Sequence, residues 1–420
     1  MLQKHTRITD TRTEHIGMLR IDPHQPGHRA PVSVTMLRNG TVTGFILIAT
    51  LLWCGDGPPA TILVEVHGYP ATGVLLLDYA KKTLDFCTST CYSISVWRFF
   101  IMKRLLIIDA LNMYFRAYIV DPSLSTNGQP IGGVKGFLKI LQKQIRETKP
   151  DEIIICWDGQ GGSQRRKSQD KNYKQGRKPI RLNRDIRNLS EAEEVENKVW
   201  QQTQLFEYLN QLPIIQSMLP AVEADDIISF VAQYHKYDDW QKVIVSSDKD
   251  FFQLCDEQTI LYRPIQKQVL NSKRIVEDFG IHPVNFALAR AIVGDRSDNL
   301  PGIAGIGLST VSKRLPFLSE EKSYTIDEVI DYCTDVDSKV KAYSTIVEKR
   351  DIVEHNYKMM QLYAPAISVQ GKQKIRHAID NFDPELNQTE FKKMMVNDGF
   401  GVVDFSDLFA SMKRIVANKA

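Results

Sequence analysis

Three short apolar runs stand out in the hydrophobic pattern after residue 101. The runs LLIID, IIICWD and VIVSSD are continuous rather than alternating, are rich in Leu or β-branched residues, and finish on an acid. Continuous apolar runs are typical of strands that are buried on both faces of a parallel sheet. Because open α/β sheets place their sites at the carboxyl ends of the strands, we expect these acids to meet at one edge of the sheet.

Segments with helical spacing of apolar residues alternate with these runs. Val134, Phe137, Leu138, Leu141 and Ile145 follow that spacing within 133–149, and a second amphipathic helix is expected over 192–211. Further helices are expected over 223–234 and in a turn at 250–255, and strands at 103–108, 152–157, 214–215 and 242–247. This alternation predicts the α/β class, with a central, mostly parallel sheet flanked by helices.

The chain divides by pattern into three parts. Residues 1–101 hold no motif that can be tied to chemistry, and we expect a non-native or mis-called leader there, with Met102 as the true start; a small accessory domain is the alternative. The apolar stretch 45–53 is too short for the ~20 residues that span a bilayer. Residues 102–271 form the predicted α/β core, and 272–420 a helical region.

Composition excludes little. Charged residues at 25% and hydrophobic ones at 43% are ordinary for a soluble globular protein, and a net charge of +3 says little about partners. The six cysteines show no zinc spacing, so we expect a reduced, cytoplasmic protein.

Nine carboxylates fall in five short clusters, each where an expected strand or helix ends. They are Asp109, Asp158, Glu223, Asp225, Asp226, Asp248, Asp250, Asp295 and Asp298. Any one of these acids alone is more often a helix cap or a solvated turn residue. Together they would repel one another unless cations lie among them, and Mg²⁺ or Mn²⁺ prefers such oxygen ligands. Two such ions can stabilise the attacking and leaving oxygens of a phosphodiester displacement, and no histidine lies in any cluster.

A basic segment separates the second expected strand from the next helix. Between 165 and 187 there are ten Lys or Arg residues against two acids, and few aliphatic residues. We expect a mobile, solvent-exposed arm there that contacts a polyanion, with Tyr173 as a base-stacking residue; a solvated charged loop is the alternative. Farther along, Gly302, Gly305 and Gly307 suit a helix-hairpin-helix, whose backbone approaches a DNA phosphate closely.

These blocks resemble the 5′-nuclease family, which includes flap endonucleases, phage 5′–3′ exonucleases with ribonuclease H activity, and the N-terminal nuclease domain of bacterial family-A DNA polymerases. The resemblance covers about 102–315 and rests on the blocks LLIIDALNMYFRAY, IICWDG, YKQGR, VEADDI, SSDKDF and GDRSDNLPGIAGIG. The remaining ~100 residues leave no room for a polymerase domain, so a free-standing nuclease of phage type is expected.

The resemblance implies roles for particular residues. One metal group would be held by Asp109, Asp158, Glu223, Asp225 and Asp226, and the second by Asp248, Asp250, Asp295 and Asp298. Asp225, Asp248, Lys174 and Arg177 are the expected catalytic residues, with Lys174 and Arg177 on a helical arch over 163–190. The expected nucleic-acid contacts are Arg116, Arg165, Arg166, Lys171, Tyr173, Lys174, Arg177, Gly302, Gly305, Gly307 and Lys313, with the helix-hairpin-helix near 295–315.

The function expected from this resemblance is that of a metal-dependent 5′–3′ exonuclease and structure-specific flap endonuclease that removes primers during replication. Its cofactors would be two Mg²⁺, with Mn²⁺ as a substitute, and a K⁺ at the helix-hairpin-helix. Its partners would be DNA with a 5′ flap or nick, RNA/DNA primer hybrids, and replication proteins such as a single-strand-binding protein or a clamp. We expect a monomer that does not bind a membrane, in the cytoplasm of a bacterial or phage-infected cell. The alternatives are a PIN-type ribonuclease and a non-catalytic, structure-specific DNA-binding protein.

Overall fold

The structure is a computed structural model. It describes residues 102–419 except 178–179, 184–185 and 187–188, together with three strands in the first 101 residues. Two compact units are present, Met1–Arg98 and Phe99–Ala420. In the first unit β1 (Ser33–Arg38), β2 (Phe45–Leu51) and β3 (Ala60–Glu65) form an antiparallel sheet, so the apolar stretch at 45–53 contains a strand. The rest of the predicted leader lies outside the described residues.

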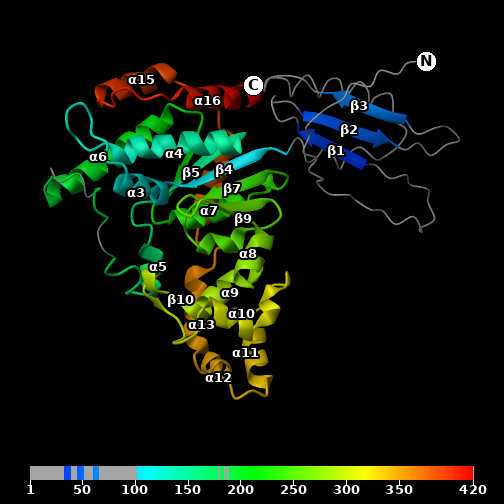
Figure 1. Cartoon of the computed structure of the whole chain (residues 1–420). Coiled ribbons are helices and arrows are strands. Elements are labelled where there is room, and N and C mark those ends of the chain that lie inside the picture. The colour runs from blue at the N-terminus through cyan, green and yellow to red at the C-terminus, as the bar shows by residue number, and fades with distance from the viewer. Residues whose placement is uncertain are drawn as a thin grey trace. The chain divides into compact units, whose positions relative to one another are not determined.

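A six-stranded sheet forms the centre of the second unit (Figure 1). Its order is β6-β5-β4-β7-β8-β9, and every neighbouring pair is parallel except β8 and β9. The strands are β4 (Arg104–Asp109), β5 (Glu152–Trp157), β6 (Ile215–Met218), β7 (Gln241–Val245), β8 (Thr259–Arg263) and β9 (Gln268–Leu270). The prediction of a mostly parallel sheet is confirmed, although β8 and β9 were not anticipated.

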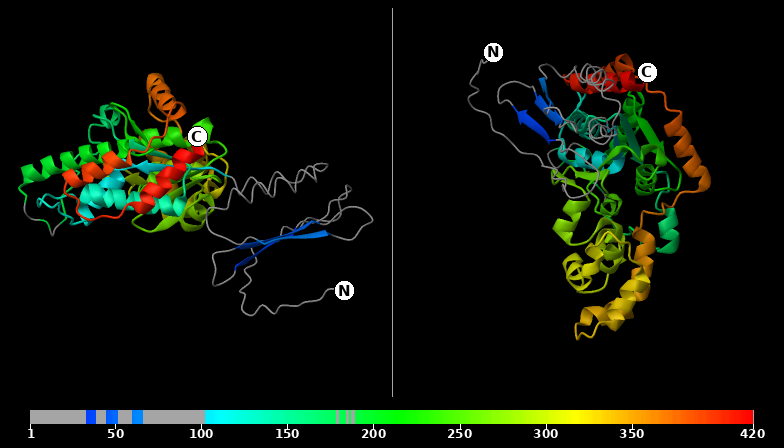
Figure 2. Two further views of the ribbon diagram at one scale, coloured as in Figure 1. Left: turned by 90° about the horizontal axis from the view of Figure 1, so that it is seen from above. Right: turned by 90° about the vertical axis from the view of Figure 1, so that its right-hand side faces the viewer.

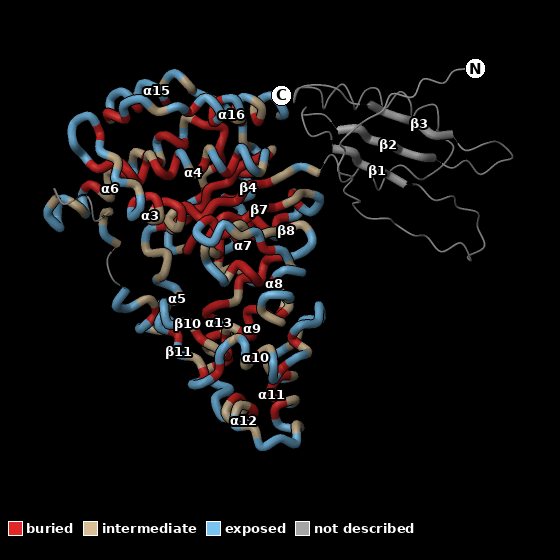
Figure 3. Tube along the Cα trace, in the orientation of Figure 1, coloured by how far each residue is buried: buried red, intermediate tan, exposed pale blue. Residues whose placement is uncertain are grey.

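Helices cover both faces of this sheet, as the views in Figures 1 and 2 agree. Leu106 and Ile108 of β4 pack toward one face, and Leu105 and Ile107 toward the other. The first face is covered by α3 (Ala110–Val120), α4 (Gly132–Thr148), α6 (Glu191–Asn210), α15 (Gln388–Asn397) and α16 (Ser406–Lys419). The second is covered by α7 (Ala224–Ala232), η2 (Asp250–Leu254), α8 (Ser272–Phe279) and α9 (Pro283–Val293). Burial is accordingly concentrated in the strands and the adjacent helix faces (Figure 3).

Local sequence explains where several helices begin and end. Ser190 and Glu193 form a capping box at the start of α6, each bonding the other's backbone N–H. Pro283 opens α9, where its missing N–H costs nothing, and the His282 side chain caps that helix. Gly280 takes the left-handed conformation that ends α8.

The expected helix-hairpin-helix lies between α9 and α10 (Leu308–Arg314). It contains the short pair β10 (Gly294–Asp295) and β11 (Leu300–Pro301), the turn η3 (Arg296–Asp298) and the glycine loop. The remaining elements are α5 (Gln164–Gln169), η1 (His235–Tyr237), η4 (Pro316–Ser319), α11 (Ile326–Asp335), α12 (Lys341–Glu348), α13 (Arg350–Met360) and α14 (Val369–Asp380).

The C-terminal helix α16 is an amphipathic core helix. Its residues Leu408, Met412 and Ile415 are buried in a hydrophobic cluster to which α4 also contributes side chains. Over the described residues, no helix combines the length and the apolar character needed to cross a membrane.

Candidate active site

Three of the acids stand at the carboxyl ends of adjacent central strands, as expected. Asp109 ends β4 and caps α3, since the Asn112 N–H donates to its Oδ1 at 3.1 Å. Asp158 follows β5, and the Ala224 N–H at the start of α7 donates to its Oδ1 at 3.0 Å. Asp248 follows β7 by three residues. The positive ends of two helices therefore face carboxylates here.

Four carboxyl groups in this region carry charge that no cationic side chain neutralises. They are Asp109, Asp158, Asp225 and Asp248, and among the described residues none of them forms an ion pair with Lys or Arg. Burial, together with the charges of Asp158 and Asp248, raises the pKa of Asp109 to about 7. Burial and the charges of Asp248 and Asp109 raise the pKa of Asp225 well above its usual range. The pKa values of Asp158 and Asp248 are raised as well, with burial as the main cause.

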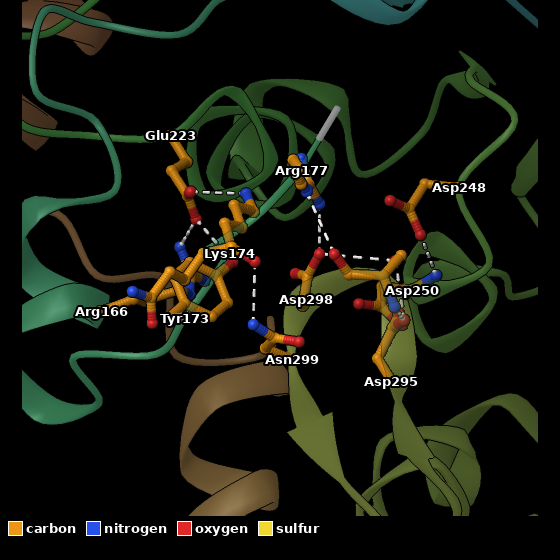
Figure 4. Close-up of polar contacts among 12 residues, drawn as sticks. Arg166, Tyr173, Lys174, Arg177, Glu223, Asp248, Asp250, Asp295, Asp298 and Asn299 are labelled. Carbon is orange, nitrogen blue, oxygen red and sulfur yellow. Dashed lines mark hydrogen bonds and ion pairs between the residues drawn. The ribbon is translucent and has the colours of Figure 1, made fainter. Parts of the chain in front are cut away.

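The other five acids have cationic partners, as Figure 4 shows for Glu223, Asp250, Asp295 and Asp298. Glu223 pairs with Arg166 and with Lys174 Nζ at 2.6 Å, and the Tyr173 hydroxyl donates to it at 3.3 Å. Burial opposes ionisation of Glu223, but Lys174 and Arg166 hold its pKa below the usual range. Asp226 pairs with Arg166 at 2.8 Å and is 2% exposed.

Asp250, Asp295 and Asp298 are paired in the same way. Arg290 bridges Asp250 at 3.1 Å and Asp295 at 2.5 Å. Arg177 pairs with Asp298, and its Nε donates to the Ser297 carbonyl at 3.2 Å. Arginine side chains of the protein therefore neutralise these three acids.

The nine carboxylates thus separate into an unpaired group of four and a paired group of five. In the part of the chain that the structure describes, no three His, Cys, Asp or Glu side chains are placed so that they could hold one ion. In this structure arginine or lysine side chains lie beside five of the acids expected in the two metal groups: Glu223, Asp226, Asp250, Asp295 and Asp298. Their role as metal ligands stays a prediction.

The described part of the basic segment is held to the rest of the unit at Arg166 and Tyr173, whereas the sequence predicted a solvent-exposed arm. Arg166 is only 11% exposed at its side chain and also donates to the Met359 carbonyl of α13 at 3.0 Å. Tyr173 is 3% exposed. Arg166 and Tyr173 both contact Glu223 at the start of α7, and Arg166 also pairs with Asp226. A charge count along the segment could not reveal these contacts. In this arrangement neither offers the free surface expected of a nucleic-acid contact, whereas Arg165 and Lys171 are exposed.

The other expected nucleic-acid contacts differ in accessibility. Gly302 is packed so tightly that a Cβ would overlap the Val293 carbonyl, while Gly305 and Gly307 face open space. Lys313 is exposed in the last turn of α10. Arg116 on α3 is partly buried, and its Nη1 has no hydrogen-bond partner among the described residues. The glycine loop is therefore approachable at Gly305 and Gly307.

Two residues of this region escaped the sequence analysis. Arg290 neutralises Asp250 and Asp295, but its position inside an apolar helix gave no signal. Asn299 bonds to the basic segment with its side-chain amide. An Asn that follows an acid in a turn is a usual local hydrogen-bonding residue, so its long-range contact could not be anticipated.

Comparison with known proteins identifies the class. Residues 104–280 match the family model described as the 5′-3′ exonuclease N-terminal resolvase-like domain. A 5′-3′ exonuclease of Buchnera aphidicola is 30% identical over 212 residues, which cover 50% of this chain and 68% of that protein. A 5′-3′ exonuclease of Aquifex aeolicus is 26% identical over 299 residues, 70% of this chain and 94% of that protein. DNA polymerase I of Caldicellulosiruptor bescii is 28% identical, but the match covers only 26% of its length.

The fold agrees with this assignment. A solved structure of the bacteriophage T5 D15 flap endonuclease, in a complex with DNA and metal ions, matches with a TM-score of 0.50 at 16% identity, over 70% of this chain and 98% of that one. The protein is therefore a nuclease with the α/β fold of 5′-nucleases. It belongs to the 5′-3′ exonuclease family, whose members hydrolyse phosphodiester bonds, and resembles the N-terminal domain of DNA polymerase I.

Proposed function

We propose that this protein is a divalent-metal-dependent 5′–3′ exonuclease and flap endonuclease that acts on nicked or branched DNA, including primer hybrids. The observation that carries this proposal is the group of four unpaired carboxylates at the carboxyl edge of the sheet: Asp109, Asp158, Asp225 and Asp248. Their raised pKa values mean that the protein alone does not compensate their charge.

The chemistry of this group of four fits divalent cations. All their side-chain ligand atoms are oxygens, which Mg²⁺ prefers, and cations would offset the burial and the mutual repulsion that raise these pKa values. We propose Mg²⁺, with Mn²⁺ as a substitute and with two ions as the working number. When bound, such ions would supply positive charge that stabilises the attacking and leaving oxygens of the phosphodiester.

Other residues of the chain would bind and orient the substrate. The charges of Asp225, Glu223 and Asp298 keep Lys174 protonated, because they raise its pKa in spite of its burial. Its ammonium group could move from Glu223 to an oxygen of the reacting phosphate, with Arg177 beside it on the same segment. Gly305 and Gly307 leave backbone open to a phosphate of the duplex, and Lys313 lies on the helix that follows. A K⁺ in this loop and contacts with replication proteins remain further proposals.

A 5′-labelled flap DNA tests this proposal. We expect cleavage near the flap junction with Mg²⁺ and none with a chelator. Asp225→Asn and Asp248→Asn should each abolish cleavage while leaving DNA binding largely intact, because the reaction and not the DNA interface is altered. Asp337→Asn is the matched control, since Asp337 is exposed in the loop between α11 and α12.

The alternative functions give different results in the same assay. Efficient cleavage of single-stranded RNA with no cleavage of the flap would indicate a PIN-type ribonuclease. Tight binding of the flap without hydrolysis in Mg²⁺ or Mn²⁺ would indicate a non-catalytic DNA-binding protein. Unchanged cleavage by Asp225→Asn would contradict the proposed role of the four unpaired carboxylates.

A further inference from the structure

The turn that carries Lys174 is tied to the loop of η3 by four hydrogen bonds and one ion pair. Lys174 N–H donates to the Asp298 carbonyl at 2.9 Å, and Arg177 bonds to the Ser297 carbonyl and the Asp298 carboxylate. The Asn299 side-chain amide donates to two carbonyls of the turn, those of Asn172 at 3.1 Å and Gln175 at 2.8 Å. We name this set of contacts the Asn299 clasp; it joins segments more than 120 residues apart (Figure 4).

Two contacts of the clasp depend on the side chain of Asn299, and the Arg177–Asp298 ion pair depends on the side chains of those two residues. Bonds to the carbonyls of Asp298 and Ser297 are open to any residue at those positions, because the acceptors are backbone atoms. The amide of Asn299 offers two N–H donors, and the turn 172–175 offers two carbonyls at the matching spacing. Aspartate has nearly the same shape but would present oxygen to both carbonyls.

The backbone on both sides of the clasp is in a sparsely populated conformation. Lys174 has a φ of 56° and Asn299 a φ of 60°, in the left-handed region that residues with a Cβ rarely adopt. Asn tolerates this region, but for Lys it persists only when the surroundings hold it. Gly176 has a φ of 72°, so the turn departs from helical geometry at two places.

This conformation decides where Lys174 points. The turn aims its ammonium group at Glu223, and its charge is also felt by Asp158 and Asp225 of the unpaired group. If the turn relaxed toward a regular helix, the Lys174 side chain would leave this direction. The clasp therefore sets the position of the cation that lies beside the acidic edge.

We propose that Asn299 is a positioning residue for the nuclease reaction: its side-chain amide fixes the turn 172–176 and so holds the Lys174 ammonium group at Glu223. The inference rests on the proposed function for its catalytic part. The structural part, that Asn299 orders the turn in the free protein, stands separately and can be measured without a substrate.

Two substitutions remove the amide without forcing the backbone. Asn299→Gly keeps the left-handed conformation, and Asn299→Asp keeps the shape but reverses the hydrogen-bonding polarity. The matched control is Asn381→Gly: Asn381 is also exposed, and its amide also donates to a backbone carbonyl, that of His377 at 2.9 Å, but at the end of α14.

Limited trypsin digestion of the free protein tests the structural part. Lys171, Lys174 and Arg177 are trypsin sites in or next to the turn, and mass spectrometry identifies each cut. Loss of two hydrogen bonds should speed cleavage there roughly tenfold in both Asn299 variants, whereas Asn381→Gly should cleave there like the wild type. Equal cleavage of the turn in all four proteins would overturn the inference.

A double-mutant cycle on flap cleavage tests the catalytic part. Asn299→Gly should lower kcat roughly tenfold with little change in KM, and should have no further effect in a Lys174→Ala background. An equal drop in both backgrounds would show that Asn299 does not act through Lys174. If the wild type cleaves no nucleic acid, the proposed function fails, and the trypsin result still decides whether the clasp orders the turn.

Discussion

Replacing Asp109 by Asn should stabilise the metal-free protein near pH 8. Asp109 is 7% exposed and has no cationic partner within the described chain, yet it is ionised at that pH. Asn keeps the Oδ1 that accepts from the Asn112 N–H at 3.1 Å. Its amide N–H can donate to the Ser246 hydroxyl, which now donates to Asp109 at 2.9 Å. The substitution therefore removes a charge and keeps the local contacts.

The pKa of Asp109 gives the magnitude. It rises from an ordinary 3.8 to about 7, mainly by burial. At 1.36 kcal/mol per unit, the ionised form costs the folded state about 4 kcal/mol at most, and we expect about 2 kcal/mol because neighbouring acids share the effect. Between pH 4 and 7 the folded state binds more protons than the unfolded state, so the wild type loses stability as pH rises. The advantage of Asp109→Asn should vanish near pH 4.

Urea unfolding at pH 4.5 and pH 8, with a chelator present, measures this effect. Asp295→Asn is the contrasting variant, since Ser297 and Arg290 hold the pKa of that acid below its usual range against the effect of burial, and its loss should destabilise at pH 8. Mg²⁺ should stabilise the wild type more than Asp109→Asn. A lower stability of Asp109→Asn than of the wild type at pH 8, or an equal advantage at both pH values, would show that the Asp109 charge does not destabilise the fold.

Two further predictions concern stability. Gly302→Ala should destabilise the protein by about 2 kcal/mol, because its Cβ would overlap the Val293 carbonyl. Gly307 faces open space, so Gly307→Ala should leave Tm unchanged. Equal Tm values for the two variants would contradict the tight packing at Gly302. Arg166→Ala should destabilise the protein by about 3 kcal/mol at neutral pH, because it leaves Glu223 and Asp226 without their shared partner. Arg165→Ala, at an exposed neighbouring site, is the control. A loss confined to DNA affinity would instead support Arg166 as a phosphate contact.

Most of the sheet could be predicted because most of its strands correspond to uninterrupted apolar runs in the sequence. Asp109 ends β4 and Asp158 follows β5, as the runs indicated, because a continuous apolar run that stops at an acid marks where a buried strand ends. Strands β8 and β9 were missed because they are short: β8 has three consecutive apolar residues and β9 has two.

The pairing of the acids could not be predicted in the same way. Sequence clusters place Glu223, Asp225 and Asp226 within four residues, but only the fold decides that Arg166 reaches the first and the last while Asp225 faces Asp248. Similarly, the charge of the basic segment is visible in the sequence, whereas its attachment to α13 and to Asn299 depends on residues far along the chain.

The sequence by itself determined the layered α/β class and the edge at which the acids gather, because hydrophobic period and strand direction are local properties that each segment carries alone. Only the tertiary structure decided which acids have cationic partners and which remain unpaired, and how the turn of Lys174 is held. Electrostatic pairing and hydrogen bonding depend on distances between segments, and those distances exist only after the chain has folded.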